Sequence, residues 1–376
     1  MERIIIIGAG FAGMAAAKKL KAEKKALEVV LIDKKAHADF LPLLPDTIGR
    51  RIKSGNLEYA TDKFCLKEGV KFINSRVESI DLEKKQIFIS GQQLAYDYLI
   101  IASGSETNFY GNDNIREHAY KLNSVEDAQL LMAALKQKSF AYFIICGGGY
   151  TGVEVATNLR QYLKKTNKEA RIIIVERSGS ILGPLPGWMK EYTLQNLKRL
   201  SIELVLNSSI EKTDGERVFL ASGTVMERAL VIWSAGVKTA KFIQDLKIEK
   251  SPQGRIKVDE NLKFSPDCFA AGDAADFTFR GVNLRMAVQF SIVEGCLAAE
   301  NIARCIKKKP LRPYRPRDLG FIIPMANNRS CGVVFGVKLK GLFPTFLHYL
   351  MCIYRSVGLR NKLALIGNLV IGEAKK

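Results

Sequence analysis

The sequence opens with Met1-Glu-Arg-Ile-Ile-Ile-Ile-Gly-Ala-Gly-Phe-Ala-Gly13, and this stretch decides the fold. Its isoleucines predict a short buried strand that runs directly into a glycine turn and then into a helix. Gly8 permits the tight turn, Gly10 leaves room for a diphosphate to approach the backbone, and Gly13 lets the helix pack closely on the strand. The free N–H groups at the start of the helix can then bind the anion. The stretch therefore predicts a dinucleotide-binding domain.

A carboxylate follows at the distance that such a domain requires. The next apolar strand, Val29-Val-Leu-Ile-Asp33, ends twenty residues after Gly13. An acid at this position accepts hydrogen bonds from the two ribose hydroxyls of the dinucleotide. We place Asp33 and the neighbouring Lys34 in the same cofactor site.

The same pattern occurs a second time in the chain. The run Phe143-Ile-Ile-Cys-Gly-Gly-Gly-Tyr-Thr-Gly152 repeats the strand, the glycine turn and the helix, and Ile172-Ile-Ile-Val-Glu176 supplies a second acid. Two such sites predict two dinucleotides. An enzyme that holds both usually passes a hydride between a nicotinamide and a flavin, because a flavin takes up two electrons and releases them singly or together.

Two other apolar strands end in small residues. They are Tyr96-Asp-Tyr-Leu-Ile-Ile-Ala-Ser-Gly104 and Asp267-Cys-Phe-Ala-Ala-Gly-Asp273. Small residues allow the backbone to approach a cofactor, and Asp273 could accept a hydrogen bond from a ribitol hydroxyl. Helices are expected near Ser124–Lys138 and over roughly Arg285–Ile306.

Length, composition and charge limit the classes of protein to which the chain can belong. A chain of 376 residues with 47% hydrophobic content can form two or three domains with buried cores. The first residues lack the pattern of a secretory signal, so we expect the protein on the cytoplasmic side. Seven scattered cysteines without a C-x-x-C pair argue against a disulfide or metal framework. The formal net charge is +19, and the segment from Lys307 onward carries 14 Lys/Arg against two acids.

The basic tail also contains two apolar stretches. Leu342–Tyr354 and Leu363–Ile371 are each shorter than the ~20 residues that a membrane-spanning helix needs. Arg355, Arg360 and Lys362 lie between them, and this pattern predicts an anchor on an anionic membrane surface rather than nucleic-acid binding. The alternative is a helical pair packed on the body or on a second subunit, and a homodimer is compatible with membrane contact.

Taken in order, the motifs resemble the FAD-dependent pyridine nucleotide oxidoreductases, and most of all the type II NADH dehydrogenases. The resemblance covers nearly the whole chain. The segments that carry it are Gly8–Gly13, Tyr96–Gly104, Gly147–Glu154, Trp233–Val237 and Ala270–Asp273. It implies an α/β protein with two Rossmann-like domains that oxidises NADH and reduces a membrane quinone without pumping protons.

The resemblance also implies an arrangement of domains. The FAD domain would be split into residues 1–110 and 251–310, with the NADH domain at 111–250 inserted between them. A basic, apolar membrane-surface region would follow at 311–376. FAD and NADH would be the cofactors, no metal would be needed, and the protein would lie on the cytoplasmic face of the cell membrane as a peripheral protein.

The resemblance assigns individual residues to these sites. The FAD residues would be Gly8, Gly10, Gly13, Asp33, Lys34, Val77, Ala102, Gly104 and Asp273. The NADH residues would be Gly147, Gly149, Gly152, Glu176, Ala235 and Gly236. Glu154 matches a glutamate near the nicotinamide, and Gln289 matches an amide of the quinone site. A simple packing or salt-bridge role is the alternative for Glu154, and a helix residue bonded to nearby backbone is the alternative for Gln289.

The chain departs from the family pattern at three positions. Tyr150 stands where the family often has proline, and Pro45 stands where an aromatic residue is common. Val293 replaces the second glutamine of the quinone-site pattern. These departures concern the identity of the acceptor more than the oxidation of NADH.

Three other functions share parts of this pattern. A sulfide:quinone oxidoreductase shares the fold but needs cysteines that reach each other across the flavin, and it does not use an intact second nucleotide site. A disulfide reductase needs a cysteine pair in the first domain, where Cys65 is alone. A flavin-bearing binding or signalling protein of the apoptosis-inducing-factor type is the non-enzyme alternative. Steady NADH oxidation with a soluble quinone would separate it from an enzyme.

Overall fold

The opening isoleucines form strand β1 (Glu2–Ile7) in the computed structural model, which describes residues 1–23, 27–50 and 52–374, with side chains as far as Leu369. β1 pairs in parallel with β2 (Leu27–Asp33) on one side and with β9 (Tyr98–Ile101) on the other. The sheet also contains β5 (Lys71–Asn74), β20 (Lys263–Ser265) and β21 (Cys268–Ala270), and its full order is β20-β21-β9-β1-β2-β5. A central strand is covered on both faces, which explains why β1 reads as a continuous apolar run.

The contacts divide the chain into two discontinuous units. Unit 1 contains residues 1–38, 59–106 and 237–317, and unit 2 contains residues 39–58, 107–236 and 318 onward. The sequence had placed residues 39–58 with the first FAD segment and residues 237–250 with the NADH domain. Which cofactor each unit binds stays a prediction.

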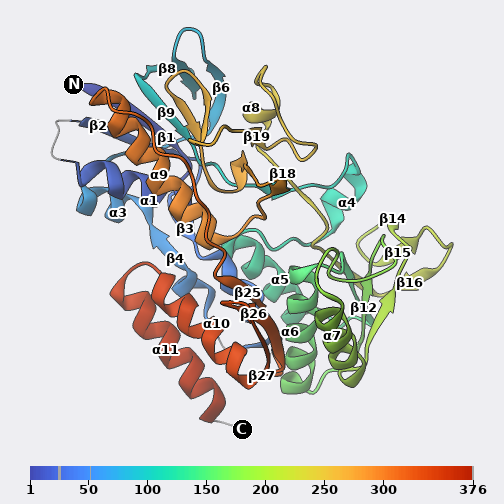
Figure 1. Ribbon diagram of the computed structural model, residues 1–376. Coiled ribbons are helices and arrows are strands. Elements are labelled where there is room, and N and C mark those ends of the chain that lie inside the picture. The colour runs from blue at the N-terminus through green and yellow to red at the C-terminus, as the bar shows by residue number, and fades with distance from the viewer. Residues whose placement is uncertain (24–26, 51, 375–376) are drawn as a thin grey trace. The chain divides into compact units, whose positions relative to one another are not determined.

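Two helices of unit 1 lie side by side, α1 (Phe11–Lys21) and α9 (Val288–Ile306), as Figure 1 shows. Their close approach requires glycine, because a Cβ on Gly295 would lie 2.1 Å from the carbonyl oxygen of Ala12. The α9 helix begins three residues after the expected Arg285.

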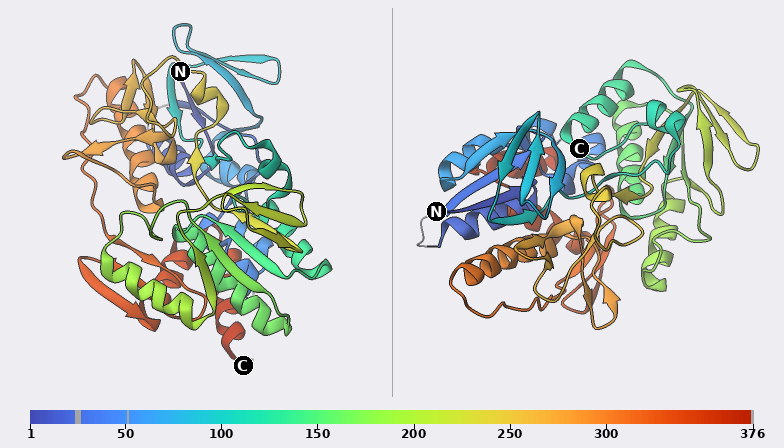
Figure 2. Two further views of the ribbon diagram at one scale, coloured as in Figure 1. Left: turned by 90° about the vertical axis from the view of Figure 1, so that its right-hand side faces the viewer. Right: turned by 90° about the horizontal axis from the view of Figure 1, so that it is seen from above.

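The other elements of unit 1 surround this core. Strands β6, β7 and β8 form an antiparallel sheet, seen as the pale blue hairpins in Figure 2. The remaining elements are α3 (Thr61–Glu68), β5 (Lys71–Asn74), β6 (Val77–Asp81), β7 (Gln86–Ile89), β8 (Gln92–Ala95), β18 (Val237–Lys238), α8 (Lys241–Gln244), β19 (Ile256–Lys257), β20 (Lys263–Ser265), β21 (Cys268–Ala270), the 3₁₀ turn η3 (Gly272–Ala274), β22 (Ala275–Asp276), β23 (Thr278–Phe279) and β24 (Val282–Asn283). Strands β3 (His37–Asp39), β4 (Glu58–Ala60) and β10 (Glu106–Thr107) fall on the borders of the units.

Unit 2 contains a second parallel sheet, with the order β13 (Ile202–Val205), β12 (Arg171–Val175), β11 (Tyr142–Cys146) and β17 (Ala229–Trp233). Helix α5 (Val125–Gln137) confirms the expected helix, and its N-cap is Ser124, whose hydroxyl accepts a hydrogen bond from the Asp127 N–H at 3.0 Å. The other elements up to the tail are η1 (Leu41–Leu43), α2 (Asp46–Gly49), η2 (Ser54–Leu57), α4 (Asp113–His118), β11 (Tyr142–Cys146), α6 (Tyr150–Thr166), β12 (Arg171–Val175), α7 (Gly187–Arg199), β13 (Ile202–Val205), β14 (Ile210–Thr213), β15 (Arg217–Leu220), β16 (Val225–Glu227) and β17 (Ala229–Trp233). Two parallel sheets with helices give the expected α/β class.

The tail is more structured than the sequence indicated. An antiparallel sheet of β25 (Gly320–Ile323), β26 (Ser330–Val334) and β27 (Val337–Gly341) precedes the apolar helices, and the sequence analysis did not foresee it. Helices α10 (Leu342–Arg355) and α11 (Leu359–Ala374) follow. Within the described residues, neither these helices nor any other one is long and apolar enough to span a membrane.

Candidate functional site

The first glycine turn in unit 1 is held by backbone contacts that exclude larger residues. A Cβ on Gly8 would lie 2.3 Å from the Ala102 carbonyl oxygen, and one on Gly13 would lie 1.8 Å from the Gly8 carbonyl oxygen. Gly8 also has φ of +107°, a conformation that favours glycine. No atom lies within 4 Å of the Cβ position at Gly10. The turn is therefore packed at Gly8 and Gly13 and open at Gly10, as the motif requires.

Asp33 ties this turn to the next strand. Its Oδ2 accepts a hydrogen bond from the Ala9 N–H at 2.6 Å, and its Oδ1 accepts one from the Lys35 N–H at 2.8 Å. A carboxylate has about four lone-pair sites, so these two bonds leave capacity for ribose hydroxyls. Lys34 is exposed at the same strand end.

The strand end at Ala102 to Gly104 also has features that fit a bound cofactor. A Cβ on Gly104 would meet no atom within 4 Å, and its φ is +67°. The Ser103 hydroxyl is buried and has no hydrogen-bond partner among the described residues. Buried hydroxyl groups in folded proteins usually have a hydrogen-bond partner, so a polar group of a bound ligand would be a suitable partner for Ser103. Val77 is buried in the core of the unit, and its contact with a cofactor stays a prediction.

Asp273 belongs to a small polar cluster at the same edge of the sheet. Its Oδ2 accepts a hydrogen bond from the Ser105 hydroxyl at 2.9 Å, and its carbonyl accepts one from Arg255 Nε at 3.2 Å. Burial raises the pKa of the Asp273 carboxyl. The neighbouring Gly272 N–H donates to Glu294 Oε2 at 2.7 Å, so helix α9 is bonded to this corner.

The expected quinone-site residues lie on the first turns of α9. Gln289 is its second residue and is half-buried. Val293 lies one turn further along and is half exposed. Gln289 and Val293 therefore lie on the same helix as Glu294. The hydrogen bond of Glu294 to the Gly272 N–H joins this helix to the loop that contains Asp273.

The glycine turn of unit 2 repeats this geometry. A Cβ on Gly152 would lie 1.9 Å from the Gly147 carbonyl oxygen, whereas one on Gly149 would meet nothing within 4 Å. Glu176 Oε2 accepts a hydrogen bond from the Gly148 N–H at 2.6 Å, and Oε1 accepts one from the Ser178 N–H at 2.8 Å. Burial would raise the pKa of Glu176, but these hydrogen bonds outweigh it and lower the pKa, so the carboxylate is ionised at neutral pH.

Ala235 and Gly236 close the same site in unit 2. A Cβ on Gly147 would lie 3.1 Å from the Ala235 Cα, so the two segments pack backbone to backbone. A Cβ on Gly236 would meet the Tyr110 hydroxyl at 2.1 Å. All six predicted NADH residues therefore belong to unit 2, and Gly147, Gly152 and Ala235 line one corner of it.

Glu154, one turn into α6, belongs to a buried polar cluster. Burial and the nearby Asp46 carboxylate raise its pKa well above the usual range. Asp46 Oδ1 accepts a hydrogen bond from the Tyr349 hydroxyl at 2.8 Å and lies 3.3 Å from Arg50 Nε. The Arg50 guanidinium stacks 4.7 Å from the centre of the Tyr349 ring. This cluster joins α2, α6 and α10 within unit 2.

Residues 2–295 match the family model described as pyridine nucleotide-disulphide oxidoreductase. The chain belongs to this family. All the predicted site residues fall inside the matched range, so the two glycine turns and their acids are features of a pyridine nucleotide-disulphide oxidoreductase.

Curated relatives narrow the resemblance. The type II NADH:quinone oxidoreductase Ndh of Mycobacterium tuberculosis is 28% identical over 73% of this chain and 67% of its own length. The demethylphylloquinone reductase NdbB of a Synechocystis strain is 26% identical over 94% of this chain and 92% of its own length. The resemblance to the type II NADH dehydrogenases is confirmed.

Solved structures agree on the fold. NDH2 from Plasmodium falciparum in complex with NADH matches with a TM-score of 0.84 at 17% identity, covering 100% of this chain and 98% of that one. The sulfide:quinone oxidoreductase from Aquifex aeolicus matches with a TM-score of 0.80 at 17% identity, covering 98% and 93%. At these identities the matches confirm the expected α/β fold and decide nothing about the acceptor.

Sequence reasoning missed four residues of this oxidoreductase. Glu294 was placed in the helix expected over roughly Arg285–Ile306 without a role of its own, although a carboxylate between Val293 and Gly295 was itself a signal. Asp46, Arg50 and Tyr349 were not singled out, because their cluster joins residues that are 303 positions apart in the chain. Its only trace in the sequence was the acid directly after Pro45.

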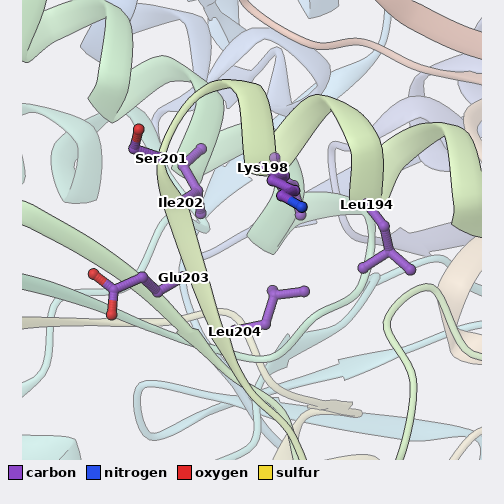
Figure 3. A pocket seen from close by; sticks show the side chains of 7 residues that line it. Leu194, Lys198, Ser201, Ile202, Glu203 and Leu204 are labelled. Carbon is purple, nitrogen blue, oxygen red and sulfur yellow. The ribbon is translucent and has the colours of Figure 1, made fainter.

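A hollow of about 370 Å³ lies elsewhere in unit 2, between α7 and β13 (Figure 3). Its lining includes Leu194, Leu204 and Glu203, and Glu203 is bound by Arg171 at 2.5 Å. β13 is an edge strand of its sheet. No predicted site residue lines this hollow, so we do not assign it to the redox site.

Glu294 gives a prediction about stability and pH. Burial raises the pKa of its carboxyl to about 7, above the ordinary 4.5. The folded protein therefore holds a proton that the unfolded chain releases, and its stability should fall as the pH rises from about 5 to about 7. Glu294→Gln still offers an oxygen to the Gly272 N–H but cannot ionise. Urea unfolding at about pH 5 and about pH 8 should show a loss of ~3 kcal/mol in the wild type and a smaller loss in the variant. Equal losses in both proteins would contradict this assignment.

Proposed function

We propose that the chain is an FAD-dependent NADH:quinone oxidoreductase that transfers electrons without pumping protons. The observation that carries this proposal is the duplicated glycine turn with its acid, one copy in each unit. Membership of the family and the names of the curated relatives support it. We assign FAD to unit 1 and NADH to unit 2.

The overall reaction consumes one NADH, one quinone and one proton, and it yields NAD⁺ and a quinol. When bound, FAD would supply the two-electron chemistry that links NADH to the quinone. The chain's own contribution is positioning. The N–H groups at the start of α1 and α6 would hold the two pyrophosphates, while Asp33 and Glu176 would accept from the ribose hydroxyls.

Glu154 is proposed to hold the proton that the reaction consumes. Burial and the nearby Asp46 raise the pKa of this carboxyl well above its usual range. The raised pKa favours the protonated form, which is the form that a proton donor beside the nicotinamide requires. Asp46 lies within electrostatic range and disfavours a second negative charge.

Gln289 is proposed to donate its amide N–H to a quinone carbonyl. Its position on the second residue of α9 is half-buried, which suits a group that contacts a ligand. The half-exposed Val293 would add apolar surface one turn away, at the position of the second glutamine in the family pattern that the sequence resembles. A quinone with a long apolar tail is compatible with that change.

Absorption spectra of the purified protein test this proposal. We expect a yellow flavin that NADH bleaches without oxygen and that a menaquinone or ubiquinone analogue then restores. Gln289→Leu should slow the return of colour about tenfold and leave bleaching unchanged, because it removes one hydrogen bond of about 1.4 kcal/mol from the quinone step alone. Thr278→Val, on an exposed strand of unit 1, is the control. Protein that takes up no flavin, or sulfide that bleaches it as NADH does, would refute the function.

The proposed role of Glu176 predicts the nucleotide preference. In this role the ionised carboxylate would lie where the 2′-phosphate of NADPH has to fit, so the enzyme should use NADH. Glu176→Ala should lower the ratio of kcat/KM for NADH over NADPH about tenfold, or 1.4 kcal/mol. Glu191→Ala removes an exposed carboxylate of α7 and should leave the ratio unchanged. If the wild-type enzyme uses NADH and NADPH equally well, Glu176 does not discriminate between a 2′-hydroxyl and a 2′-phosphate.

We also propose that α10 and α11 lie on an anionic membrane surface at the cytoplasmic face. The inner face of α10 is buried at Thr345, Tyr349 and Cys352, whereas Phe343 and Phe346 on its outer face are 61% and 62% exposed. A contiguous apolar surface of this kind is typical of an interaction site, and the basic residues of the tail add attraction to anionic lipid. A homodimer through the same face is the competing proposal.

Substitutions on the outer face of α10 test membrane binding better than a deletion of the tail, which would also remove Tyr349 from Asp46. Phe343→Gln/Phe346→Gln should cut the fraction that floats with anionic vesicles at low salt by at least fivefold, because two anchoring rings lose their apolar contact. Leu130→Gln/Val225→Gln, at exposed positions of unit 2, is the matched control. If the double variant still binds vesicles but changes from dimer to monomer in sedimentation, the face is a subunit interface instead.

A further inference from the structure

A basic pocket of about 270 Å³ lies in unit 1, at the C-terminal ends of α1 and α9. Eight residues line it, and five of them are cations: Lys19, Arg304, Lys307, Lys309 and Arg312. Two carboxylates, Glu23 and Glu300, are the acids of the lining, so the pocket carries three positive charges in excess. Ala303 is the one remaining lining residue.

The loop after α9 builds one wall of this pocket. Asn301 is fully buried, and its Oδ1 accepts a hydrogen bond from the Arg312 N–H at 2.8 Å. Its Nδ2 donates to the Arg312 carbonyl at 3.0 Å, and Arg304 Nε donates to the Pro310 carbonyl at 2.8 Å. These bonds fold the chain back over its own helix. They hold Lys309 and Arg312 beside the pocket in advance, which lowers the cost of binding a ligand there.

The two carboxylates are already engaged. Glu23 pairs with Lys307 at 2.5 Å, and Glu300 pairs with Arg312 at 3.3 Å. Within the described part of the chain, neither Lys19 nor Lys309 has a carboxylate within ion-pair distance. The pocket therefore keeps two cations that an external anion can neutralise.

Stabilisation of helix ends explains only part of this arrangement. Lysines and arginines in the last turn of a helix interact favourably with its C-terminal carbonyls, and this accounts for Lys19 and Arg304. Lys309 and Arg312 lie beyond the end of α9. Their return to the helix brings cations together against their mutual repulsion, which a bound anion would relieve.

The pocket is separate from the proposed FAD site. The glycine turn lies at the N-terminal end of α1, and the eleven residues of that helix span roughly 16 Å. The chemistry differs as well, because seven of the eight lining residues are charged and none is an aromatic residue on which a base could stack.

We propose that this pocket binds a small ligand with two or more phosphate charges, through Lys19, Lys309 and the arginines beside them. The volume fits a diphosphate or a phosphorylated head group, and charge with hydrogen bonding from the cations provides the recognition. The site belongs to unit 1 and does not depend on the redox function proposed above.

Inorganic pyrophosphate tests the site directly. The full-length protein, saturated with FAD so that the glycine turn is occupied, is titrated by calorimetry at constant ionic strength. We expect one saturable site, and Lys19→Gln/Lys309→Gln should weaken binding at least tenfold. Lys71→Gln/Lys247→Gln removes the same charge from exposed positions of unit 1 outside the pocket and should leave binding unchanged.

A second arm identifies the source of the phosphate. Phosphatidylcholine vesicles with and without phosphatidic acid are compared as carriers for the wild type and the two variants. If the Lys19/Lys309 variant alone loses its preference for phosphatidic acid, the ligand is a lipid head group. If its preference is retained while pyrophosphate binding is lost, the ligand is a free phosphate compound. Pyrophosphate binding that is absent, or that falls equally in both double variants, overturns the proposal.

Discussion

One hydrogen bond, made twice, organises this molecule. In each unit the N–H that follows the first glycine of the turn donates to a carboxylate at the end of the next strand, at 2.6 Å in both cases. Parallel pairing makes this possible, since Ile7 lies opposite Ile32 and Cys146 lies opposite Val175, so the acid comes one residue beyond the last pair. Strand pairing therefore sets the position of the carboxylate, and the hydrogen bond from the carboxylate stabilises the glycine turn.

This constraint explains why the two sites agree although their acids differ. Glutamate is one methylene longer than aspartate, yet both carboxylates accept two N–H groups from their own turn and strand end. In Glu176 these hydrogen bonds lower the pKa of the carboxyl. An ionised carboxylate with spare lone pairs is also what a ribose diol needs. In the proposed function, one side chain would therefore both anchor the turn and bind the nucleotide.

Much of this could be predicted from the sequence, because the information is local. The glycines at which a Cβ would overlap a carbonyl oxygen belong to a short sequence motif, so they can be recognised from the sequence. The helix α5 that Ser124 caps can be predicted in the same way. The cluster of Asp46, Arg50 and Tyr349 is not, because it depends on segments far apart in sequence meeting in space. The sheet β25–β27 was missed for a related reason: its strands are short, and the basic residues among them suggested a surface segment.

The same cluster explains how α10 can have two different faces. A buried carboxylate without partners would cost several kcal/mol, so the Tyr349 hydroxyl and the Arg50 guanidinium around Asp46 fix the inner face of the helix. The orientation of α10 is therefore set by contacts on its buried face. Phe343 and Phe346 on the outer face are exposed, and their burial against another apolar surface would be favourable. A helix fixed by polar contacts on one side can carry an apolar surface on the other, which is the condition for docking onto a membrane or a second subunit without first unfolding.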